Sequence, residues 1–392
     1  MSEKKVVIAL IGGGYGAILH LNGYKRVHGV DVCIKTLVDV DVKKAKELQK
    51  LYGIQNITTG YDDVLKDPEI DIIDIVTPPA LHADMVYQAL MAGKHVICEK
   101  PFTGYFGKDG DQEPIGLHVP KRRMYETVCK ELENGKNIVN ESKKLFMYAE
   151  NFVYAPNVRK SAEFIKAKGS RILFMKGEAS LRGSSSPVAG QWCKTGGGSL
   201  MRNAIHPLTG ILWLKKEEAA SRGEEIRVIS VNADAGRVVP KLSDYERRHL
   251  NADPVDVEDN ITVTLTFSDS SKALIIGSDT CLGGTKTYIE VYANDATFNC
   301  NIAPTDYLQT YFLDEEGISD IYLGEMLPNK LGWNRSFVSD EVLRGYTAEL
   351  QDFVECVALG RKPVSDYDLA AEAVRLVYAA YTSAEEGRRI DL

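Results

Sequence analysis

The feature that most constrains the fold is the start of the chain, where an apolar run ends abruptly at three glycines. Residues Val6–Ile11 are all apolar, and Gly12–Gly14 follows directly. A short apolar run that ends in glycines predicts a buried parallel strand followed by a tight turn into a helix. The N-terminus of that helix would face an anion. The alternative is an ordinary strand-to-helix turn without a ligand.

The spacing of small residues in this turn favours a dinucleotide site. Gly12 would make the sharp turn, and Gly14 would let backbone N–H groups approach a pyrophosphate. Ala17 stands where a small residue lets the helix pack against the strand. Tyr15 and Gly16 lie between them and complete the predicted cofactor contacts of this turn.

A second apolar run, Cys33–Val38, ends at Asp39. A carboxylate at the end of the second strand can accept hydrogen bonds from ribose hydroxyls, so Asp39 favours NAD. A 2′-phosphate would lie unfavourably close to Asp39 and Asp41, although Lys43 and Lys44 keep NADP as the less favoured alternative. Asp39 could equally cap the following helix, and both roles could hold together.

The length of 392 residues predicts two domains, which we place at residues 1–150 and 151–392. The first half alternates strands with helices, and its further strands are Asp71–Val76 and His95–Cys98. This alternation predicts an α/β fold with a doubly wound parallel sheet. Ligands bind such sheets beyond the carboxyl ends of the strands, where Thr77, Pro78 and Glu99 follow.

The second half has a different period. Ile261–Phe267 alternates apolar residues with threonines, which predicts a half-buried antiparallel strand. Comparable strands are expected at residues 171–180, 226–231, 272–277 and 287–293. They predict an α+β domain with a large, mostly antiparallel sheet, open on the face of Thr262, Thr264 and Tyr288. That face would join subunits into a homodimer or homotetramer. Two helices, 341–359 and 366–385, would end the chain, and the last of them would return toward the first domain.

Composition excludes several classes of function. A net charge of −8 disfavours nucleic-acid binding, and no apolar stretch is long enough to cross a membrane. Seven scattered cysteines, without a Cys-x-x-Cys pair, indicate neither a metal site nor a disulfide framework. The chain begins without the pattern of a signal peptide, so we expect a cytoplasmic enzyme.

Several motifs together resemble the glucose-fructose oxidoreductase, inositol dehydrogenase and rhizopine-catabolism family (Gfo/Idh/MocA). They are the glycine turn followed by His20, Thr77-Pro78-Pro79 followed by His82, Gly93-Lys94-His95-Val96, Glu99-Lys100-Pro101, and Gly196-Gly197-Gly198 leading to His206. The resemblance covers most of the chain. It implies a Rossmann domain that binds NAD, with Thr77, Pro78, His82, Glu99 and Lys100 near the cofactor. For the lone histidines His20, His82 and His95 the alternative is a structural role.

The resemblance also implies a reaction. Oxidising a carbinol carbon requires a general base and a donor that stabilises the alkoxide, and a histidine and a lysine suit these roles. In the family these are the residues at Lys100 and His206, which would also contact substrate. The implied function is NAD-dependent oxidation of a secondary hydroxyl in a sugar, sugar acid or cyclitol.

Two other functions remain open within this resemblance. One is a glycosidase-like lyase or hydrolase that retains NAD and uses transient oxidation, and the other is a non-catalytic NAD-sensing regulator. Free NADH should accumulate only with a true dehydrogenase.

The stretch from Thr103 to Arg123 departs from the family pattern, in which a helix follows the Glu-Lys-Pro element almost directly. It is rich in glycine and charge and predicts a long inserted loop beside the site. Its functional interpretation is a lid or a subunit contact, and the alternative is a mobile surface excursion.

A second departure lies four residues before His206, where the family usually has an aspartate and this chain has Arg202, with Asn203 beside it. If the segment is helical, Arg202 and His206 share one face. Arg202 could grip a substrate carboxylate, so the carbohydrate would be anionic, or it could form an internal salt bridge with Glu99, Glu150 or Glu178.

Residue type alone suggests further contacts to substrate. Tyrosine and tryptophan rings can stack on a sugar face, although both are equally common in cores. The candidates for the remaining wall of the site are Asn151, Tyr154, Trp192 and Lys194.

Overall fold

The computed structural model describes residues 4–302, 308–321, 329–336 and 338–392. Its first layer is a six-stranded sheet with the order β3-β2-β1-β4-β5-β6, in which all neighbours are parallel. The strands are β1 (Lys5–Ile11), β2 (Asp31–Val38), β3 (Asn56–Thr58), β4 (Ile72–Ile75), β5 (His95–Glu99) and β6 (Phe146–Ala149). The strand order reverses between β1 and β4, and ligands of such sheets bind at this point.

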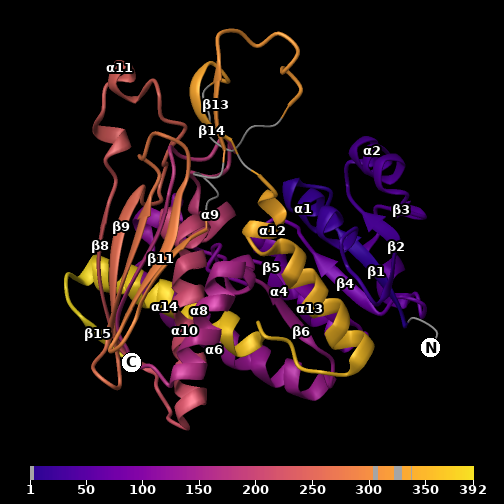
Figure 1. Ribbon diagram of the computed structural model, residues 1–392, viewed down its shortest axis with the longest axis horizontal. Coiled ribbons are helices and arrows are strands. Elements are labelled where there is room, and N and C mark those ends of the chain that lie inside the picture. Colours follow the sequence, from indigo (N-terminus) through magenta and orange to yellow (C-terminus); the bar gives the residue numbers. More distant parts are fainter. Residues whose placement is uncertain (1–3, 303–307, 322–328, 337) are drawn as a thin grey trace.

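Helices cover both faces of this sheet, as the alternating sequence pattern predicts (Figure 1). They are α1 (Tyr15–Tyr24), α2 (Val42–Tyr52), α3 (Tyr61–Lys66), α4 (His82–Met91) and α6 (Lys121–Ser142). The strands β1, β4, β5 and β6 are almost wholly buried, because helices cover both sides of them.

A second sheet has the order β12-β11-β7-β10-β9-β8-β15. Only β7 and β10 pair in parallel, so the prediction of a mostly antiparallel sheet is confirmed. Its strands are β7 (Ile172–Ser180), β8 (Val228–Gly236), β9 (Asn260–Phe267), β10 (Lys272–Ser278), β11 (Lys286–Ala293), β12 (Thr297–Asn301) and β15 (Ile390–Asp391).

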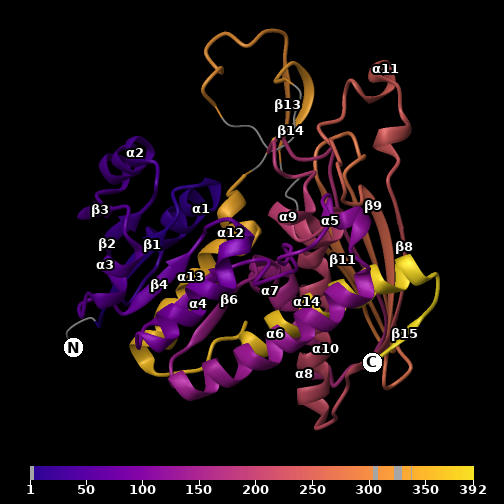
Figure 2. The same ribbon diagram turned by 180° about the vertical axis from the view of Figure 1, so that it is seen from behind.

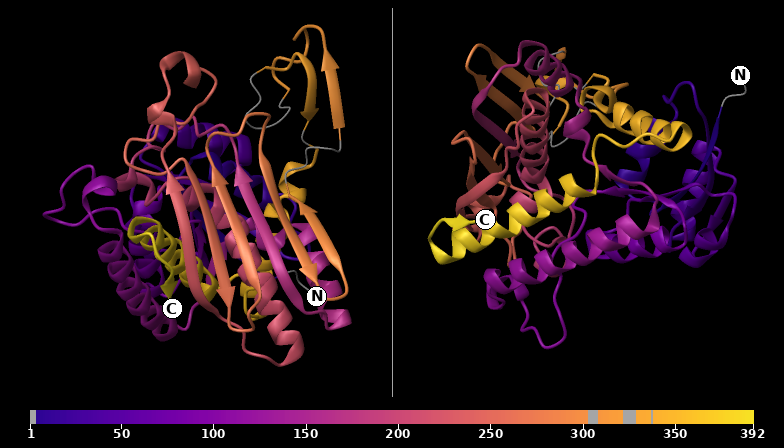
Figure 3. Two further views of the ribbon diagram at one scale, coloured as in Figure 1. Left: turned by 90° about the vertical axis from the view of Figure 1, so that its left-hand side faces the viewer. Right: turned by 90° about the horizontal axis from the view of Figure 1, so that it is seen from below.

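One face of the second sheet is covered by helices and the other is bare (Figure 3, left). In β9 the apolar residues Ile261, Val263 and Leu265 are buried, whereas Thr262 is exposed. The covering helices are α8 (Pro156–Lys168), α10 (Ile205–Arg222) and α14 (Tyr367–Glu386). The period of two in the sequence therefore identified the open face.

Two helices from the end of the chain return to the first sheet. α13 (Tyr346–Leu359) packs on α1 and β1, and α14 runs along α6 and β8 (Figure 2). One continuous hydrophobic core consequently spans both sheets. Where the sequence predicts one helix over 341–359, the structure has α12 (Asp340–Leu343) and α13, separated by Gly345 at φ 98°.

The inserted stretch 103–123 packs against residues of the second half of the chain. The hydroxyl of Tyr378 accepts a hydrogen bond from the Tyr105 amide, and the Trp192 indole donates to the Tyr105 carbonyl at 3.1 Å. Farther along, the Gly116 amide donates to Asp256 at 2.9 Å. Tyr105 and Ile115 are buried, so these parts of the stretch are packed rather than exposed on the surface, whereas residues 108–110 are exposed.

The remaining elements are short. They are α5 (Ile115–His118), α7 (Asn151–Tyr154), α9 (Trp192–Thr195), α11 (Asp244–Arg247), a π-helical turn η2 (Leu200–Ala204), the 3₁₀ turns η1 (Pro79–Leu81) and η3 (Val239–Lys241), and a separate hairpin of β13 (Leu308–Phe312) and β14 (Gly332–Ser336). The seven cysteines are free thiols. Within the described ranges, no helix combines the length and apolar character of a membrane span.

Gly198, the last glycine of the triplet before η2, packs directly against the buried Glu258. Glu258 accepts hydrogen bonds from the amides of Gly198 and Leu200, each at 2.9 Å, and from the Tyr381 hydroxyl at 3.0 Å. Burial raises the pKa of Glu258 to about 7 despite these donors. A Cβ on Gly198 would lie 1.9 Å from the Glu258 carbonyl oxygen, so only glycine fits there.

We therefore expect Gly198→Ala to lower the free energy of unfolding by about 3 kcal/mol, because the added methyl group collides with backbone. Urea denaturation measures the change. Gly236→Ala is the matched control, because a Cβ there meets nothing within 4 Å, and its effect should stay within about 0.5 kcal/mol. Equal stability of the two variants would contradict this account of the triplet.

Candidate active site

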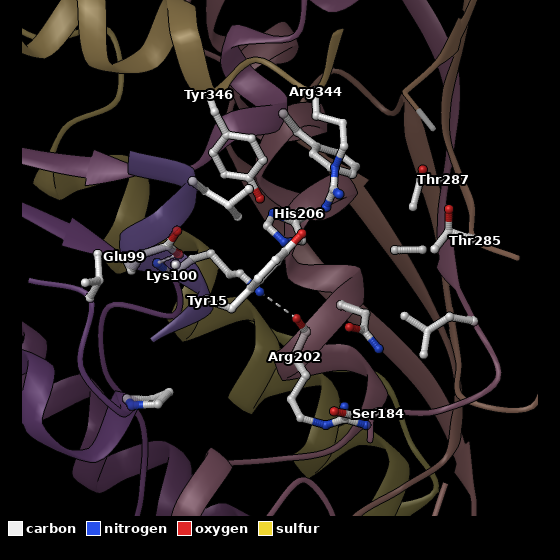
Figure 4. A pocket seen from close by; sticks show the side chains of 18 of the residues that line it. Tyr15, Glu99, Lys100, Ser184, Arg202, His206, Thr285, Thr287, Arg344 and Tyr346 are labelled. Atoms are coloured by element: carbon white, nitrogen blue, oxygen red, sulfur yellow. Dashed lines mark hydrogen bonds between the residues drawn. The ribbon is translucent and has the colours of Figure 1, made fainter. Parts of the chain in front are cut away.

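A cavity of about 420 Å³ lies between the carboxyl edge of the first sheet and the helix-covered side of the second sheet (Figure 4). The first sheet and its helices contribute Tyr15, Gly16, Leu19, Val76, Thr77, Pro79, His82, Glu99 and Lys100. The second half contributes Phe152, Ala179, Ser180, Leu181, Ser184, Arg202, Asn203, His206, Thr285, Thr287, Arg344 and Tyr346. The cavity therefore joins the predicted nucleotide edge to the predicted catalytic residues.

The glycine turn leaves room for a phosphate. Gly12 adopts φ 100°, and a Cβ there would lie 2.9 Å from the Val76 carbonyl oxygen, so the turn needs glycine. A Cβ on Gly14 would meet nothing within 4 Å, so the space before the N-terminus of α1 is open. Gly14 caps α1 without a side chain, which leaves the first helical N–H groups for an anion. Ala17 is fully buried under the helix.

Asp39, at the end of β2, braces this turn. Its two carboxylate oxygens accept the amides of Gly13 and Asp41, the latter at 2.7 Å. The cap of α2 is Asp41, which accepts the amides of Lys43 and Lys44, so the alternative of Asp39 as that cap is wrong. Each carboxylate oxygen retains a lone pair that could accept a ribose hydroxyl.

The segments that follow β4 and β5 form the adjoining part of the cavity wall. Thr77 and Pro79 line it, whereas Pro78 lies between them outside the lining. The ring nitrogens of His82 each lie 2.8 Å from a carbonyl oxygen, Nδ1 from Pro101 and Nε2 from Thr77. His82 therefore ties the ends of β4 and β5 together, and burial lowers its pKa.

Lys100 follows β5 and crosses the cavity. Its Nζ donates to the carbonyl oxygen of Arg202 at 2.8 Å (Figure 4). Burial lowers the pKa of Lys100, the nearby Glu99 and Glu150 oppose that shift, and Arg202 adds to it. A lysine with a lowered pKa and two acidic side chains nearby can both donate a hydrogen bond and move a proton.

His206 is held by two residues that the sequence did not suggest for it. Its Nδ1 lies 2.6 Å from Oε1 of the fully buried Glu150, and its ring stacks on Phe152 with centroids 4.8 Å apart. The same oxygen of Glu150 already accepts the Phe152 amide at 3.2 Å. Because Oε1 already accepts the Phe152 amide, it acts as an acceptor toward His206 as well. We therefore assign the hydrogen between Nδ1 and Oε1 to Nδ1. In a neutral ring Nε2 then carries no hydrogen, so it is the nitrogen that can take a proton from a ligand.

Buried charges lie beneath Lys100. Nδ1 of His20 is 2.9 Å from Asp74 and its Nε2 is 3.4 Å from Glu99. Burial alone would lower the pKa of His20, but the two carboxylates outweigh it and raise the pKa well above its usual value. Burial would likewise raise the pKa of Glu99, and His20, Lys100 and His206 outweigh it. Glu99 is therefore a carboxylate that compensates the charge of Lys100.

Arg202 and Asn203 share a partner on the segment after β10. A guanidinium nitrogen of Arg202 pairs with Asp279, and the Asn203 amide donates to the same carboxylate at 3.0 Å. An internal salt bridge thus exists, but the expected partners Glu99, Glu150 and Glu178 were wrong. Arg202 and His206 both line the cavity, although η2 around Arg202 is π-helical rather than α-helical.

The four residues predicted for the remaining wall are not among the lining residues of this cavity. The Asn151 amide donates to the Arg344 carbonyl, the Tyr154 hydroxyl donates to Asp352 and the Trp192 indole donates to Tyr105. Lys194 is exposed. All three buried side chains satisfy their polar atoms within the core, which is the alternative that the residue types left open.

Other lining residues were missed. Among them are Ser184, Thr285, Thr287, Arg344, Tyr346 and Phe152, and Glu150 lies behind His206 without lining the cavity. None belongs to a local motif, and the strand 287–293 that contains Thr287 was the nearest signal. No residue of the inserted stretch 103–123 is among those that line the described cavity.

Comparison with protein families finds two matches. Residues 6–107 match the family described as "Oxidoreductase family, NAD-binding Rossmann fold". Residues 175–392 match "Oxidoreductase family, C-terminal alpha/beta domain" of the same Gfo/Idh/MocA group.

Individual relatives cover nearly the whole chain. Levoglucosan dehydrogenase of Pseudarthrobacter phenanthrenivorans is 26% identical over 379 residues, covering 90% of this chain and 89% of the relative. The crystal structure of GenD2 from gentamicin A biosynthesis, in complex with NAD, superposes with a TM-score of 0.77 at 21% identity over 100% of this chain and 97% of that one. Myo-inositol 2-dehydrogenase from Lactobacillus plantarum gives a TM-score of 0.72 at 19% identity over 99% and 100%. These two structures show the shared fold.

The contact between Glu150 and His206 can be tested by NMR. We expect the neutral His206 ring to carry its hydrogen on Nδ1, because Glu150 is the acceptor. Glu150→Leu removes the acceptor, so the Nδ1–H form should lose its dominance in long-range ¹H–¹⁵N spectra. His28→Ala, an exposed position, helps to assign the signals without disturbing the site. An unchanged tautomer in Glu150→Leu would show that Glu150 does not orient the ring.

Proposed function

The chain belongs to the Gfo/Idh/MocA oxidoreductase family, and we propose that it transfers a hydride between NAD and a secondary hydroxyl of a carbohydrate or cyclitol. The observation that carries this proposal is one cavity lined by Tyr15 and Gly16 of the glycine turn together with Lys100 and His206. A sugar dehydrogenase as a relative over 90% of the chain supports it.

The residues present suit a dinucleotide. The open space before α1 can accept a pyrophosphate, and the carboxylate oxygens of Asp39 can accept hydrogen bonds from a ribose. Thr77, His82 and Glu99 line the same cavity as Lys100. When bound, the nicotinamide would supply the hydride acceptor.

The chain's own residues handle the proton. Lys100 donates a hydrogen bond to the substrate hydroxyl oxygen while Arg202 holds its ammonium in place through the backbone carbonyl. His206 Nε2 takes the hydroxyl proton as the carbinol hydrogen departs as hydride, and Glu150 stabilises the resulting imidazolium. The alcohol loses one proton and one hydride and becomes a ketone.

The charges of the cavity favour a neutral carbohydrate. Arg202 pairs with Asp279, Arg344 lies 3.3 Å from Asp340, and Lys100 lies beside Glu99. Each of these cations is compensated by a carboxylate, so a substrate carboxylate would have to compete for it. We therefore propose a neutral sugar as the substrate, in preference to the anionic carbohydrate that Arg202 alone suggested.

The bare face of the second sheet is our candidate for a homodimer or homotetramer contact. Thr262, Thr264 and Tyr288 lie on strands of this sheet, and Figure 3 shows no helix over that face.

We expect NAD to bind more tightly than NADP, because Asp39 would repel a 2′-phosphate. Asp39→Asn should weaken NAD binding roughly 10-fold to 100-fold, which corresponds to the loss of one charged hydrogen bond of about 1.5–3 kcal/mol. The preference for NAD over NADP should also become smaller. Titration followed by intrinsic fluorescence measures both affinities. Asp244→Asn is the matched control, because it removes one negative charge from an exposed side chain on α11 in the second half of the chain. Tighter binding of NADP to the native protein would contradict the assignment.

We expect His206→Ala and Lys100→Met each to lower kcat roughly 100-fold to 10,000-fold while NAD affinity is retained. Initial rates of NADH formation with a panel of neutral sugars and cyclitols measure the loss. The neutral-range limb of the pH–rate profile should disappear with His206. His28→Ala is the control, since this histidine is exposed and belongs to no motif.

The same assay separates the other candidate functions. Product formation without accumulation of NADH would identify a lyase or hydrolase that retains NAD. Near-native turnover in His206→Ala or Lys100→Met would remove that residue from the mechanism.

A further inference from the structure

A second recess of about 220 Å³ adjoins the cavity described above. Ser184 and Arg202, which Figure 4 labels side by side in the first cavity, line both spaces, so the two spaces are neighbours across these residues. The remaining wall of the second recess comes from the segments 185–190 and 251–257 and from Asp279. It contains no residue of the first sheet or its helices, so it lies on the substrate side, away from the glycine turn.

The walls of this recess are joined by backbone contacts. The Asn251 amide donates to the Arg182 carbonyl at 2.7 Å, and the Val255 amide donates to the Gly190 carbonyl at 2.9 Å. The two segments also approach each other at glycines, because a Cβ on Gly190 would lie 2.0 Å from the Asp253 carbonyl oxygen. The recess is therefore a built feature of the fold rather than a gap between independent loops.

The lining suits a neutral polyhydroxylated ligand. Ser184, Ser185 and Ser186 offer hydroxyl groups that can donate and accept, and Pro187 and Val257 offer apolar surface for ring C–H groups. Nε of Arg202 is buried and has no hydrogen-bond partner within the part of the chain that the structure describes. A buried donor of this kind calls for an acceptor. Arg202 is paired with Asp279, and Asp253 adds a second carboxylate to the lining, so the recess, as the described residues line it, has no uncompensated cation to attract an anion.

We propose that this recess binds a second sugar ring, so that the preferred substrate is a disaccharide or other glycoside whose first ring is oxidised beside His206. The inference rests on the proposed function, which it deepens. The first cavity must hold both the reacting part of the cofactor and the oxidised ring, and a glycosidic substituent of that ring would extend past Ser184 and Arg202 into the second recess.

The first test compares matched sugars on the native enzyme. NADH formation is measured with saturating NAD for glucose against maltose, cellobiose and trehalose, and for galactose against lactose and melibiose. At least one disaccharide should exceed its monosaccharides at least tenfold in kcat/KM. NADH from monosaccharides without such a gain would overturn the inference and leave the proposed function standing. NADH from neither set would overturn the inference, and the wider panel of sugars and cyclitols described above then decides the proposed function separately.

A pair of variants then locates the effect. Ser185→Phe fills the second recess from an exposed loop position, and Val188→Phe adds the same ring to the same loop at a residue outside the lining. Ser185→Phe should reduce kcat/KM for the preferred disaccharide to the level of the monosaccharide and leave the monosaccharide unchanged. Val188→Phe should change neither. Equal losses for both sugars, or no loss in Ser185→Phe, would overturn the assignment of the recess.

Discussion

The hydrogen bond from Lys100 to the carbonyl oxygen of Arg202 fixes the geometry on which the site depends. It joins the carboxyl end of β5 in the first sheet to the π-helical turn that precedes His206. A π-helical turn exposes carbonyl groups that an α-helix would bond internally, and such turns are frequent at functional sites. The two catalytic candidates therefore share a cavity because one of them is bonded to the backbone that carries the other.

Burying Lys100 requires the carboxylates around it. Transfer of an ammonium group out of water is costly, and Glu99 and Glu150 offset part of this cost. The two carboxyls differ in their surroundings, because Glu99 lies near the charged His20, whereas burial dominates at Glu150 and raises its pKa. The pKa of Glu99 is lowered and that of Glu150 is raised, so the two carboxyls near Lys100 differ in how readily each holds a proton.

The sequence predicted what depends on local pattern. The glycine turn, the strand that ends at Asp39, the two sheets and the bare face followed from periodicity and turn residues, and the resemblance brought Lys100 and His206 together. Contacts between distant segments had no local signal. Glu150 reaches His206 across 56 positions, and Asp279 reaches Arg202 across 77. Tyr154 and Trp192 were suggested by residue type, which does not reveal whether a ring faces a ligand or the core.

The inserted stretch affects how substrate can enter. The hydroxyl of Tyr378 accepts the Tyr105 amide and donates to the carbonyl of Gly196 at 2.7 Å, so it links the insertion to the glycines that lead to His206. With α13 and α14 also crossing back, a hinge motion between the sheets would break buried hydrogen bonds and open a continuous core. We expect exchange of ligands to proceed through small loop displacements on a rigid body, with little of the domain closure by which many two-domain enzymes set their turnover.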